Sequence, residues 1–302
     1  MAPTFIPIEA ETKLDWLDLT DALWSGHIRP RAELSDTFLY RDRDTMLSRA
    51  AWIDGLGLAV KTATVFPGNT AYGTPNINGA VSLFDDKYGT LAAVLDFHLV
   101  TKWKTAGDSL LAARQLARPD SRVILILGAG TVAGSLHEAY SALFPAAEFL
   151  IWNRTLANAE TFANARTNVS VVEDLSTSVA SADIITSATM STEPILNGEW
   201  LKPGQHIDLI GAYRPDMREA DDAVLKRARI FTDSFATSVD HIGEFKIPLA
   251  HGTIDRADLI ADYYDRSSFK RRDASEITLF KNAGGAHLDL MTSRYILETW
   301  ST

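Results

Sequence analysis

The chain contains no cysteine among its 302 residues. This absence excludes disulfides, thiolate metal sites and a cysteine nucleophile, and it fits a reducing compartment. Positive charge is in the minority: a formal net charge of -10 disfavours binding to nucleic acid or to an anionic membrane. The most apolar runs, Val123–Leu127 and Phe149–Trp152, are far shorter than a membrane span, and residues 1–9 show no secretory signal pattern. We therefore expect a cytoplasmic protein with no nucleic-acid or membrane partner.

The sequence falls into two regions with different patterns of predicted secondary structure. Up to about residue 105, short strands broken by glycine and asparagine turns follow one predicted helix, which is typical of an antiparallel or mixed sheet. Beyond it, apolar strands alternate with helices, as in a parallel sheet covered on both faces. The expected fold is α/β, with a Rossmann-type doubly wound parallel sheet at residues 106–281 inserted into a second, α+β domain at 1–105 and 282–302. The predicted strands are 36–40, 46–53, 56–64, 81–84, 91–96, 123–127, 149–152, 184–187, 206–210 and 230–232, and the predicted helices are 12–24, 105–116, 132–144, 156–166 and 286–300.

A glycine turn, Gly128-Ala129-Gly130-Thr131-Val132-Ala133, directly follows strand 123–127 and opens a predicted helix. In dinucleotide-binding turns the first glycine allows the bend and the second lets the backbone approach a pyrophosphate. Unpaired N–H groups at the helix start then bind that pyrophosphate. Glycine often serves turn geometry alone, but the strand before it and the helix and strand after it favour cofactor binding here. We predict that Gly128, Gly130, Thr131 and Val132 contact a dinucleotide.

The next strand ends in Asn153-Arg154-Thr155, where an acidic residue usually binds the adenosine ribose. No carboxylate there repels a 2′-phosphate, and Arg154 can bind one through a charge-assisted fork. This pattern favours NADP(H) as the cofactor. If Arg154 is only a solvated residue at the start of a helix, the cofactor is NAD(H) instead. Ser187, Ala188 and Thr189, at the end of strand 184–187, are expected to line the cofactor too. The seven histidines show no metal-ligand spacing, so no metal site is predicted.

Several segments, in order from about residue 56 to the end, resemble the ornithine cyclodeaminase/mu-crystallin family. They include Leu58-Ala59-Val60-Lys61, Thr101-Lys102-Trp103-Lys104-Thr105-Ala106, the glycine turn, Gly211-Ala212-Tyr213-Arg214-Pro215-Asp216-Met217-Arg218-Glu219 and Phe280-Lys281-Asn282-Ala283-Gly284. The resemblance implies a homodimer built through the non-Rossmann domain and an active site between the two domains. It also implies small amino or imino acids as substrates, because members either cyclise a diamino acid with loss of ammonia or reduce imino acids with NAD(P)H.

The resemblance also indicates the site residues. Lys61 matches the family's active-site lysine; we expect it at a strand end, where it binds the substrate carboxylate or moves protons rather than guarding a sheet edge. Lys104 stands in place of a carboxylate-binding arginine and keeps the charge without the planar fork. Arg49 is either a substrate-binding residue or a paired structural arginine. Thr105, Lys281 and Gly284 match cofactor-contacting positions, although Thr105, at the expected start of a helix, can also be a cap.

Tyr213 stands where cyclodeaminases carry an aspartate. A phenol with a pKa of about 10 is no anionic base at neutral pH, but it can donate a proton or hydrogen bond to an imine nitrogen. The predicted function is therefore reduction of small imino acids with NADP(H) or NAD(H). Dicarboxylic imino acids such as iminosuccinate are also possible substrates, because positive charge is available on Lys61, Lys104, Arg49 and Arg214. Ornithine cyclodeamination and a non-catalytic NADP-binding protein are the alternatives.

Overall fold

The computed structural model describes residues 2–301, which form two compact units. The first unit comprises Met1–Gly107 and Gly285–Thr302, and the second comprises Asp108–Gly284. The second unit is thus inserted into the first. The boundaries between the units follow residues 107 and 284, whereas the sequence predicted them after residues 105 and 281. Helix α2 (Phe97–Leu116) carries the chain across the first change-over.

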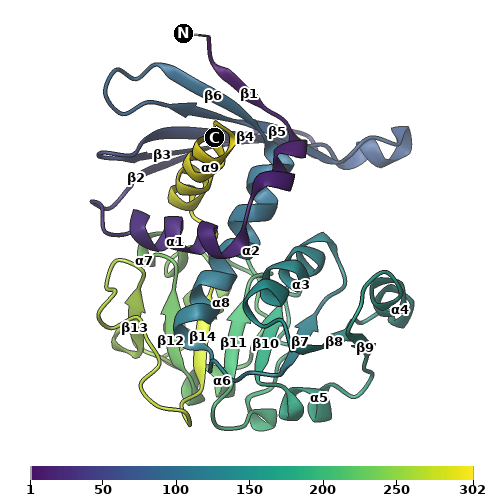
Figure 1. Cartoon of the computed structure of the whole chain (residues 1–302). Helices are drawn as coiled ribbons and strands as arrows, with labels where there is room; N and C mark the ends of the chain where they lie inside the picture. The colour runs from purple at the N-terminus through teal and green to yellow at the C-terminus, as the bar shows by residue number, and fades with distance from the viewer. Residues whose placement is uncertain (1, 302) are drawn as a thin grey trace. The chain divides into compact units, whose positions relative to one another are not determined.

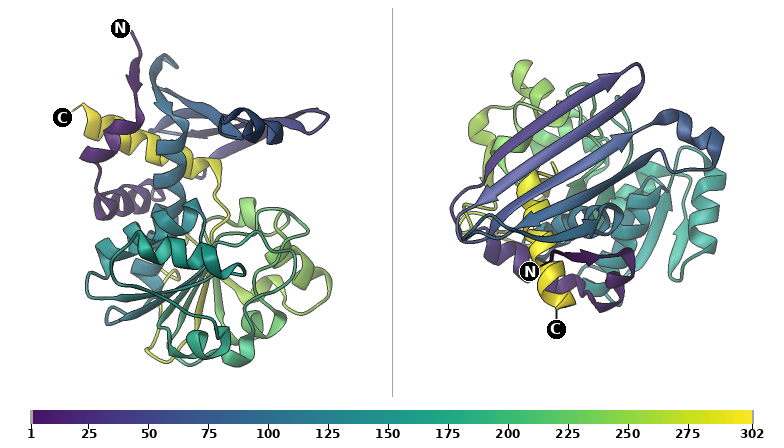
Figure 2. Two further views of the ribbon diagram at one scale, coloured as in Figure 1. Left: turned by 90° about the vertical axis from the view of Figure 1, so that its right-hand side faces the viewer. Right: turned by 90° about the horizontal axis from the view of Figure 1, so that it is seen from above.

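The first unit is built on a six-stranded mixed sheet in the order β1-β6-β5-β4-β3-β2 (Figure 1). Strand β1 pairs in parallel with β6, and every other pairing is antiparallel. Helix α9 (Ala286–Trp300) packs against β3, β4 and β5 and crosses one face of the sheet, as the right-hand view of Figure 2 shows. The other elements are β1 (Thr4–Ile6), η1 (Ile8–Lys13), α1 (Trp16–Gly26), β2 (Glu33–Arg41), β3 (Asp44–Ile53), β4 (Gly57–Val65), η2 (Pro67–Tyr72), β5 (Ile77–Phe84) and β6 (Leu91–Asp96).

The second unit is an eight-stranded, fully parallel sheet with helices on both faces, in the order β13-β12-β14-β11-β10-β7-β8-β9 (Figure 1). Leu125, Ile185, Ile207 and Leu279 form a fully buried row across four strands. Each such side chain stabilises the fold by about 1.5–3 kcal/mol. The strands are β7 (Val123–Leu127), β8 (Glu148–Trp152), β9 (Val169–Val171), β10 (Ile184–Ser187), β11 (His206–Leu209), β12 (Arg229–Thr232), β13 (Leu259–Asp262) and β14 (Thr278–Lys281). The helices are α3 (Thr131–Leu143), α4 (Leu156–Asn164), α5 (Leu175–Ser181), η3 (Gly198–Trp200), α6 (Asp222–Arg227), α7 (Phe235–Ser238), α8 (Gly243–Ala250) and η4 (Arg256–Asp258).

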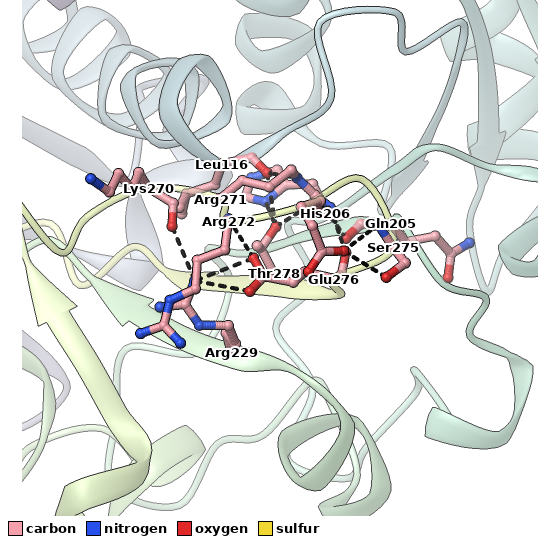
Figure 3. A network of polar contacts seen from close by, with 11 residues as sticks. Leu116, Gln205, His206, Arg229, Lys270, Arg271, Arg272, Ser275, Glu276 and Thr278 are labelled. Atoms are coloured by element: carbon pink, nitrogen blue, oxygen red, sulfur yellow. Dashed lines mark hydrogen bonds and ion pairs between the residues drawn. The ribbon is translucent and has the colours of Figure 1, made fainter.

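The amino ends of the central strands of this unit are tied together by Arg271 (Figure 3). Its guanidinium donates to the carbonyl of Leu116 at 2.6 Å and to Thr278 Oγ1 at 3.1 Å. Thr278 Oγ1 also lies 3.0 Å from Nδ1 of His206. Arg271, Thr278 and His206 are therefore joined in one hydrogen-bond network inside the unit.

The expected α/β fold, with a parallel sheet inserted into a second domain containing a mixed sheet, is confirmed. The predicted start of α2 at residue 105 is wrong, because the carboxylate of Asp96 accepts the Leu99 N–H at 2.8 Å and caps the helix at Phe97. The helix predicted at 12–24 is α1, which begins only at Trp16 because Asp15 caps it. Strands β1, β9 and β13 were missed because three or four residues carry almost no periodic signal.

Candidate functional site

The glycine turn after β7 has the geometry of a backbone binding loop. Gly128 adopts φ +97°, and a Cβ there would lie 2.8 Å from the carbonyl oxygen of Ala188, so only glycine fits. At Gly130, by contrast, an added Cβ would meet no atom within 4 Å. Gly130 is the N-cap of α3 and provides no side-chain hydrogen bond to the first N–H groups of the helix. The exposed backbone at Gly130, Thr131 and Val132 is therefore suited to binding an anion.

A buried carboxylate ties the loops that follow β10 and β11. Oε1 of Glu219 accepts hydrogen bonds from Ser187 Oγ at 2.6 Å and from both the N–H and the hydroxyl of Thr189 at 2.8 Å. Its Oε2 accepts the N–H groups of Gly211 at 2.6 Å and Ala212 at 3.1 Å. Five donors thus fix two loops at the carboxyl edge of the sheet, the edge at which ligands bind in open α/β sheets.

In the first unit, the register of the sheet lines up charged residues on the face covered by α9. Arg49 lies directly opposite Lys61, and Asp36 lies opposite Arg49. Lys61 belongs to the buried side of β4 together with Ala59 and Ala63. The expectation that Lys61 emerges at a strand end is therefore wrong: it lies in mid-strand, facing the helix.

Asp289, in the first turns of α9, meets this lysine. Nζ of Lys61 donates to Oδ1 of Asp289 at 3.0 Å, and Nζ of Lys104 lies 4.0 Å from the same oxygen. All three side chains are buried. The Lys61 ammonium also lies 4.9 Å from the ring centroid of Phe97, a cation–π distance. The ammonium groups of Lys61 and Lys104 thus lie near the carboxylate of Asp289 in a buried environment.

Burial and neighbouring charge shift the ionisation of this cluster. Burial lowers the pKa of Lys61 to about 8, with the charge of Lys104 acting in the same direction and Asp289 opposing both. Burial would raise the pKa of Asp289, but the charges of Lys104, Lys61 and Arg49 outweigh it, and that pKa is lowered. His287, two residues before Asp289 on α9, has its pKa lowered to about 3 by burial and by Lys104, so it is neutral at pH 7. The cluster therefore contains an ionised aspartate and a lysine poised near neutral pH.

A sequence model of the ornithine cyclodeaminase/mu-crystallin family matches residues 31–302. The chain belongs to this family. It is 48% identical to the Delta(1)-pyrroline-2-carboxylate reductase of Paracoccus denitrificans over 304 residues, which cover 98% of this chain and 96% of that protein. It is 37% identical to the ketimine reductase mu-crystallin of Rattus norvegicus over 247 residues, covering 81% of this chain and 77% of that protein.

Among solved structures, the fold is similar to that of Thermococcus litoralis Delta(1)-pyrroline-2-carboxylate reductase in complex with NADH and L-proline. The TM-score is 0.88 at 25% identity, and the alignment covers 98% of this chain and 97% of that one. The family assignment made from the sequence motifs is thereby confirmed.

The structure distributes the other family-matched residues between the two units. In the second unit, Tyr213 is 57% exposed in the loop after β11, whereas Lys281 is fully buried. The ammonium of Lys281 donates to the carbonyls of Leu209 and Asn282 at 2.8 and 2.7 Å. Gly284 adopts φ +67°, a conformation that favours glycine. In the first unit, Thr105 lies inside α2 rather than at its start, which rules out the expected cap.

The end of β8 remains polar and accessible. Asn153 donates to the carbonyl of Thr155 at 2.9 Å, and Arg154 and Thr155 are exposed.

Within residues 2–301, no three His, Asp or Glu side chains gather as metal ligands would. None of the helices in that range is long and apolar enough to span a membrane.

Sequence reasoning missed the two buried carboxylates that organise these sites. Asp289 has the usual signature of an acidic residue in a first helical turn, where it complements the helix dipole. Glu219 lies in the motif that carries the resemblance, but its partners are 7 to 32 residues away. No local pattern shows that five donors converge on it.

Proposed function

We propose that this protein is a nicotinamide-dependent oxidoreductase that reduces the C=N bond of small imino acids. The observation that carries the proposal is the buried Lys61–Asp289–Lys104 cluster, which holds two cations against one anion in a member of this family. Such a cluster binds the carboxylate of an amino or imino acid. The relatives named as pyrroline-2-carboxylate and ketimine reductases support the same chemistry.

The residues of the second unit fit a dinucleotide. Gly128, Gly130, Thr131 and Val132 offer backbone to the pyrophosphate, and the open space at Gly130 permits close approach. The strand-end residues Ser187, Ala188 and Thr189, together with Lys281 and Gly284, are proposed as further contacts, and so is Thr105 of the first unit. Because the ammonium of Lys281 is engaged by two carbonyls, any contact it makes is through its backbone. When bound, the nicotinamide supplies the hydride.

We further propose a preference for NADP(H) over NAD(H). No carboxylate is present at residues 153–155, and Arg154 is exposed beside Asn153 and Thr155. The test compares kcat/KM for NADPH and NADH in the wild type and in Arg154→Gln. We expect the NADPH-to-NADH ratio to exceed one and to fall about tenfold in the variant, the effect of losing one charge-assisted contact. A wild-type ratio below one would assign the pocket to NAD(H), and a ratio unchanged in Arg154→Gln would mean that Arg154 does not bind the 2′-phosphate.

On the substrate side, Lys61 and Lys104 are proposed to bind the carboxylate, and the Tyr213 hydroxyl to donate the proton to the imine nitrogen. Arg49 donates from Nε to both oxygens of Asp36, at 3.1 and 3.2 Å, which favours the paired structural arginine over a substrate contact. The hydride and the proton together convert C=N to CH–NH, and the carboxylate anchor keeps the carbon in position.

A homodimer through the first unit is also proposed, in the cytoplasm. The sheet face opposite α9 carries a row of Trp52, Leu58 and Phe84, and beside it Val60 and Val94. Trp52 is 50% exposed, and the other four are partly exposed. A sheet face of this composition favours association with a second copy. Val60→Glu should give monomers in sedimentation velocity, whereas Tyr88→Glu, in an exposed turn of the same unit, should not; dimers in both variants would refute this interface.

The function is tested by following NADPH and NADH oxidation with a panel of imines. The panel contains pyrroline-2-carboxylate, piperideine-2-carboxylate, iminosuccinate formed from oxaloacetate and ammonia, and pyruvate with methylamine or ammonia. Rapid oxidation with one imine would establish the reductase. If no imine of the panel causes cofactor oxidation and ornithine is converted to proline and ammonia, the protein is a cyclodeaminase. If neither the imine assay nor the ornithine assay shows turnover, a non-catalytic binding protein is favoured.

A further inference from the structure

The side chain of Tyr213 projects from a backbone that is held on both sides. The N–H groups of the two residues before it donate to Oε2 of Glu219 at 2.6 and 3.1 Å. After it, the carbonyl of Arg214 accepts the N–H of Gly243 at 3.0 Å. The phenol itself is more than half exposed. An exposed side chain therefore stands on a backbone whose position is set by hydrogen bonds to other parts of the second unit.

Glu219 also joins this backbone to the loop that follows β10. Its Oε1 accepts three hydrogen bonds from Ser187 and Thr189. The two loops touch directly as well, because a Cβ added to Gly211 would lie 1.7 Å from the carbonyl oxygen of Thr189. Ser187 and Thr189 are the residues proposed above to line the cofactor. One carboxylate thus holds the loop that carries Tyr213 against the loop proposed to contact the nicotinamide cofactor.

We propose that Glu219 is a positioning residue for proton transfer, which places the Tyr213 hydroxyl relative to the bound cofactor. In the reduction, the imine carbon accepts the hydride and the imine nitrogen accepts the hydroxyl proton, and the phenolate then regains a proton from water. The donor must lie within hydrogen-bond reach of the nitrogen, and small displacements of reacting groups cost rate. This inference rests on the proposed reductase function and adds a residue that acts through Tyr213.

The surroundings of Glu219 suit a support of this kind. Its side chain is fully buried, a costly place for a carboxylate unless donors surround it. Its own backbone is fixed too, because its carbonyl accepts the N–H groups of Ile195 and Leu196, both at 2.9 Å. A reacting group must be held to within about 0.5 Å by contacts that are themselves locked in place. Glu219 meets this condition for the backbone of Tyr213.

The test is a double-mutant cycle between Glu219→Gln and Tyr213→Phe, with kcat and KM measured at saturating cofactor for the imine that is reduced fastest. Tyr213→Phe removes the donated proton, so kcat should fall about hundredfold, a typical contribution of a general acid. We expect Glu219→Gln to lower kcat about tenfold or more and to change KM less than about threefold. In the Tyr213→Phe background the same replacement should change kcat less than about threefold, because no proton donor is left to position. The exposed Glu199→Gln is the control and should keep the wild-type kcat and KM.

A wild-type kcat in Glu219→Gln, or equal fold losses in both backgrounds, would overturn the proposal, because a merely structural residue acts whether or not Tyr213 is present. A wild-type kcat in Tyr213→Phe would also overturn it, while leaving the reductase function intact. Should Glu219→Gln fail to fold, Thr189→Val takes its place in the cycle, since it removes one of the five hydrogen bonds and keeps the acid. Its loss of kcat should likewise vanish in the Tyr213→Phe background; no loss, or an equal loss in both, refutes the proposal. Absence of turnover by the wild type with every imine would reject the reductase function instead.

Discussion

The carboxylate of Glu244 accepts the backbone N–H of Glu219 at 2.8 Å, so one buried acid lies directly behind another. Burial and the charge of Glu219 raise the pKa of Glu244 to about 7. Glu219 itself accepts hydrogen bonds from five donors in the loops after β10 and β11. Two buried acids, one behind the other, therefore organise the carboxyl edge of the parallel sheet.

Replacement of this acceptor should weaken both the fold and cofactor binding. In Glu219→Gln one acceptor oxygen becomes an NH2 group that faces N–H or O–H donors. Buried donors left without an acceptor cost about 1–3 kcal/mol each, so we expect the free energy of unfolding to fall by about 2 kcal/mol or more. Denaturant unfolding and titration of NADPH fluorescence measure the two effects. The exposed Glu199→Gln is the control, and unchanged cofactor affinity in a destabilised Glu219→Gln would show that these loops do not line the cofactor.

The two glycines of the turn after β7 should behave differently on substitution by alanine. At Gly128 the positive φ and the 2.8 Å approach to Ala188 predict a loss of stability of about 1–3 kcal/mol. At Gly130 a methyl group enters open space, so the melting temperature should stay near that of the wild type. Cofactor affinity should nevertheless fall at least tenfold, because the methyl group occupies the approach of the pyrophosphate. Wild-type affinity in Gly130→Ala would contradict the proposed cofactor position.

Ligand binding should depend on the protonation of Lys61. Its pKa of about 8 means that the ammonium is present below that pH and is lost above it. Affinity for the monocarboxylate pyrrole-2-carboxylate in the presence of cofactor should therefore fall as the pH rises through about 8. Lys61→Met should weaken this ligand about tenfold to hundredfold, since hydrogen bonds to charged groups contribute about 1.5–3 kcal/mol. Calorimetric titration measures both effects; a flat pH profile in the wild type would exclude Lys61 as the anchor.

The fold and the family were predictable because their signals are local. The strand, glycine turn and helix at residues 123–144 can be recognised from consecutive residues, and the chain order of the motifs identifies the family. The lysine cluster was only half predictable. Lys61 and Lys104 stand in recognisable segments, but Asp289 is 228 residues from Lys61 and meets it only through packing of α9 on β4. Charge compensation of this kind depends on tertiary contacts, which is why the sequence did not show that Asp289 lies beside the two lysines.

The last prediction concerns stability at acid pH and the fully buried His206 (Figure 3). Its Nδ1 contacts Thr278, its Nε2 has no hydrogen-bond partner in the described chain, and Arg271 is close by. Burial, reinforced by the charge of Arg271, lowers the pKa of His206 to about 3. The unfolded chain therefore binds a proton that the folded chain does not between that pH and about 6.5, and stability falls as the pH decreases through this range.

Between pH 7 and pH 5 this histidine should cost the wild type about 2 kcal/mol of unfolding free energy. His206→Asn keeps a polar group near Thr278 and removes the titration, so the variant should lose about that much less over the same pH step. The difference between the two proteins isolates His206, because Glu244 and the buried His287 titrate in both. Urea unfolding at the two pH values measures it, with His251→Asn, an exposed histidine, as the control. If the wild type and His206→Asn lose the same free energy of unfolding between pH 7 and pH 5, His206 takes up its proton in the folded protein. The amino edge of the sheet would then be open to solvent.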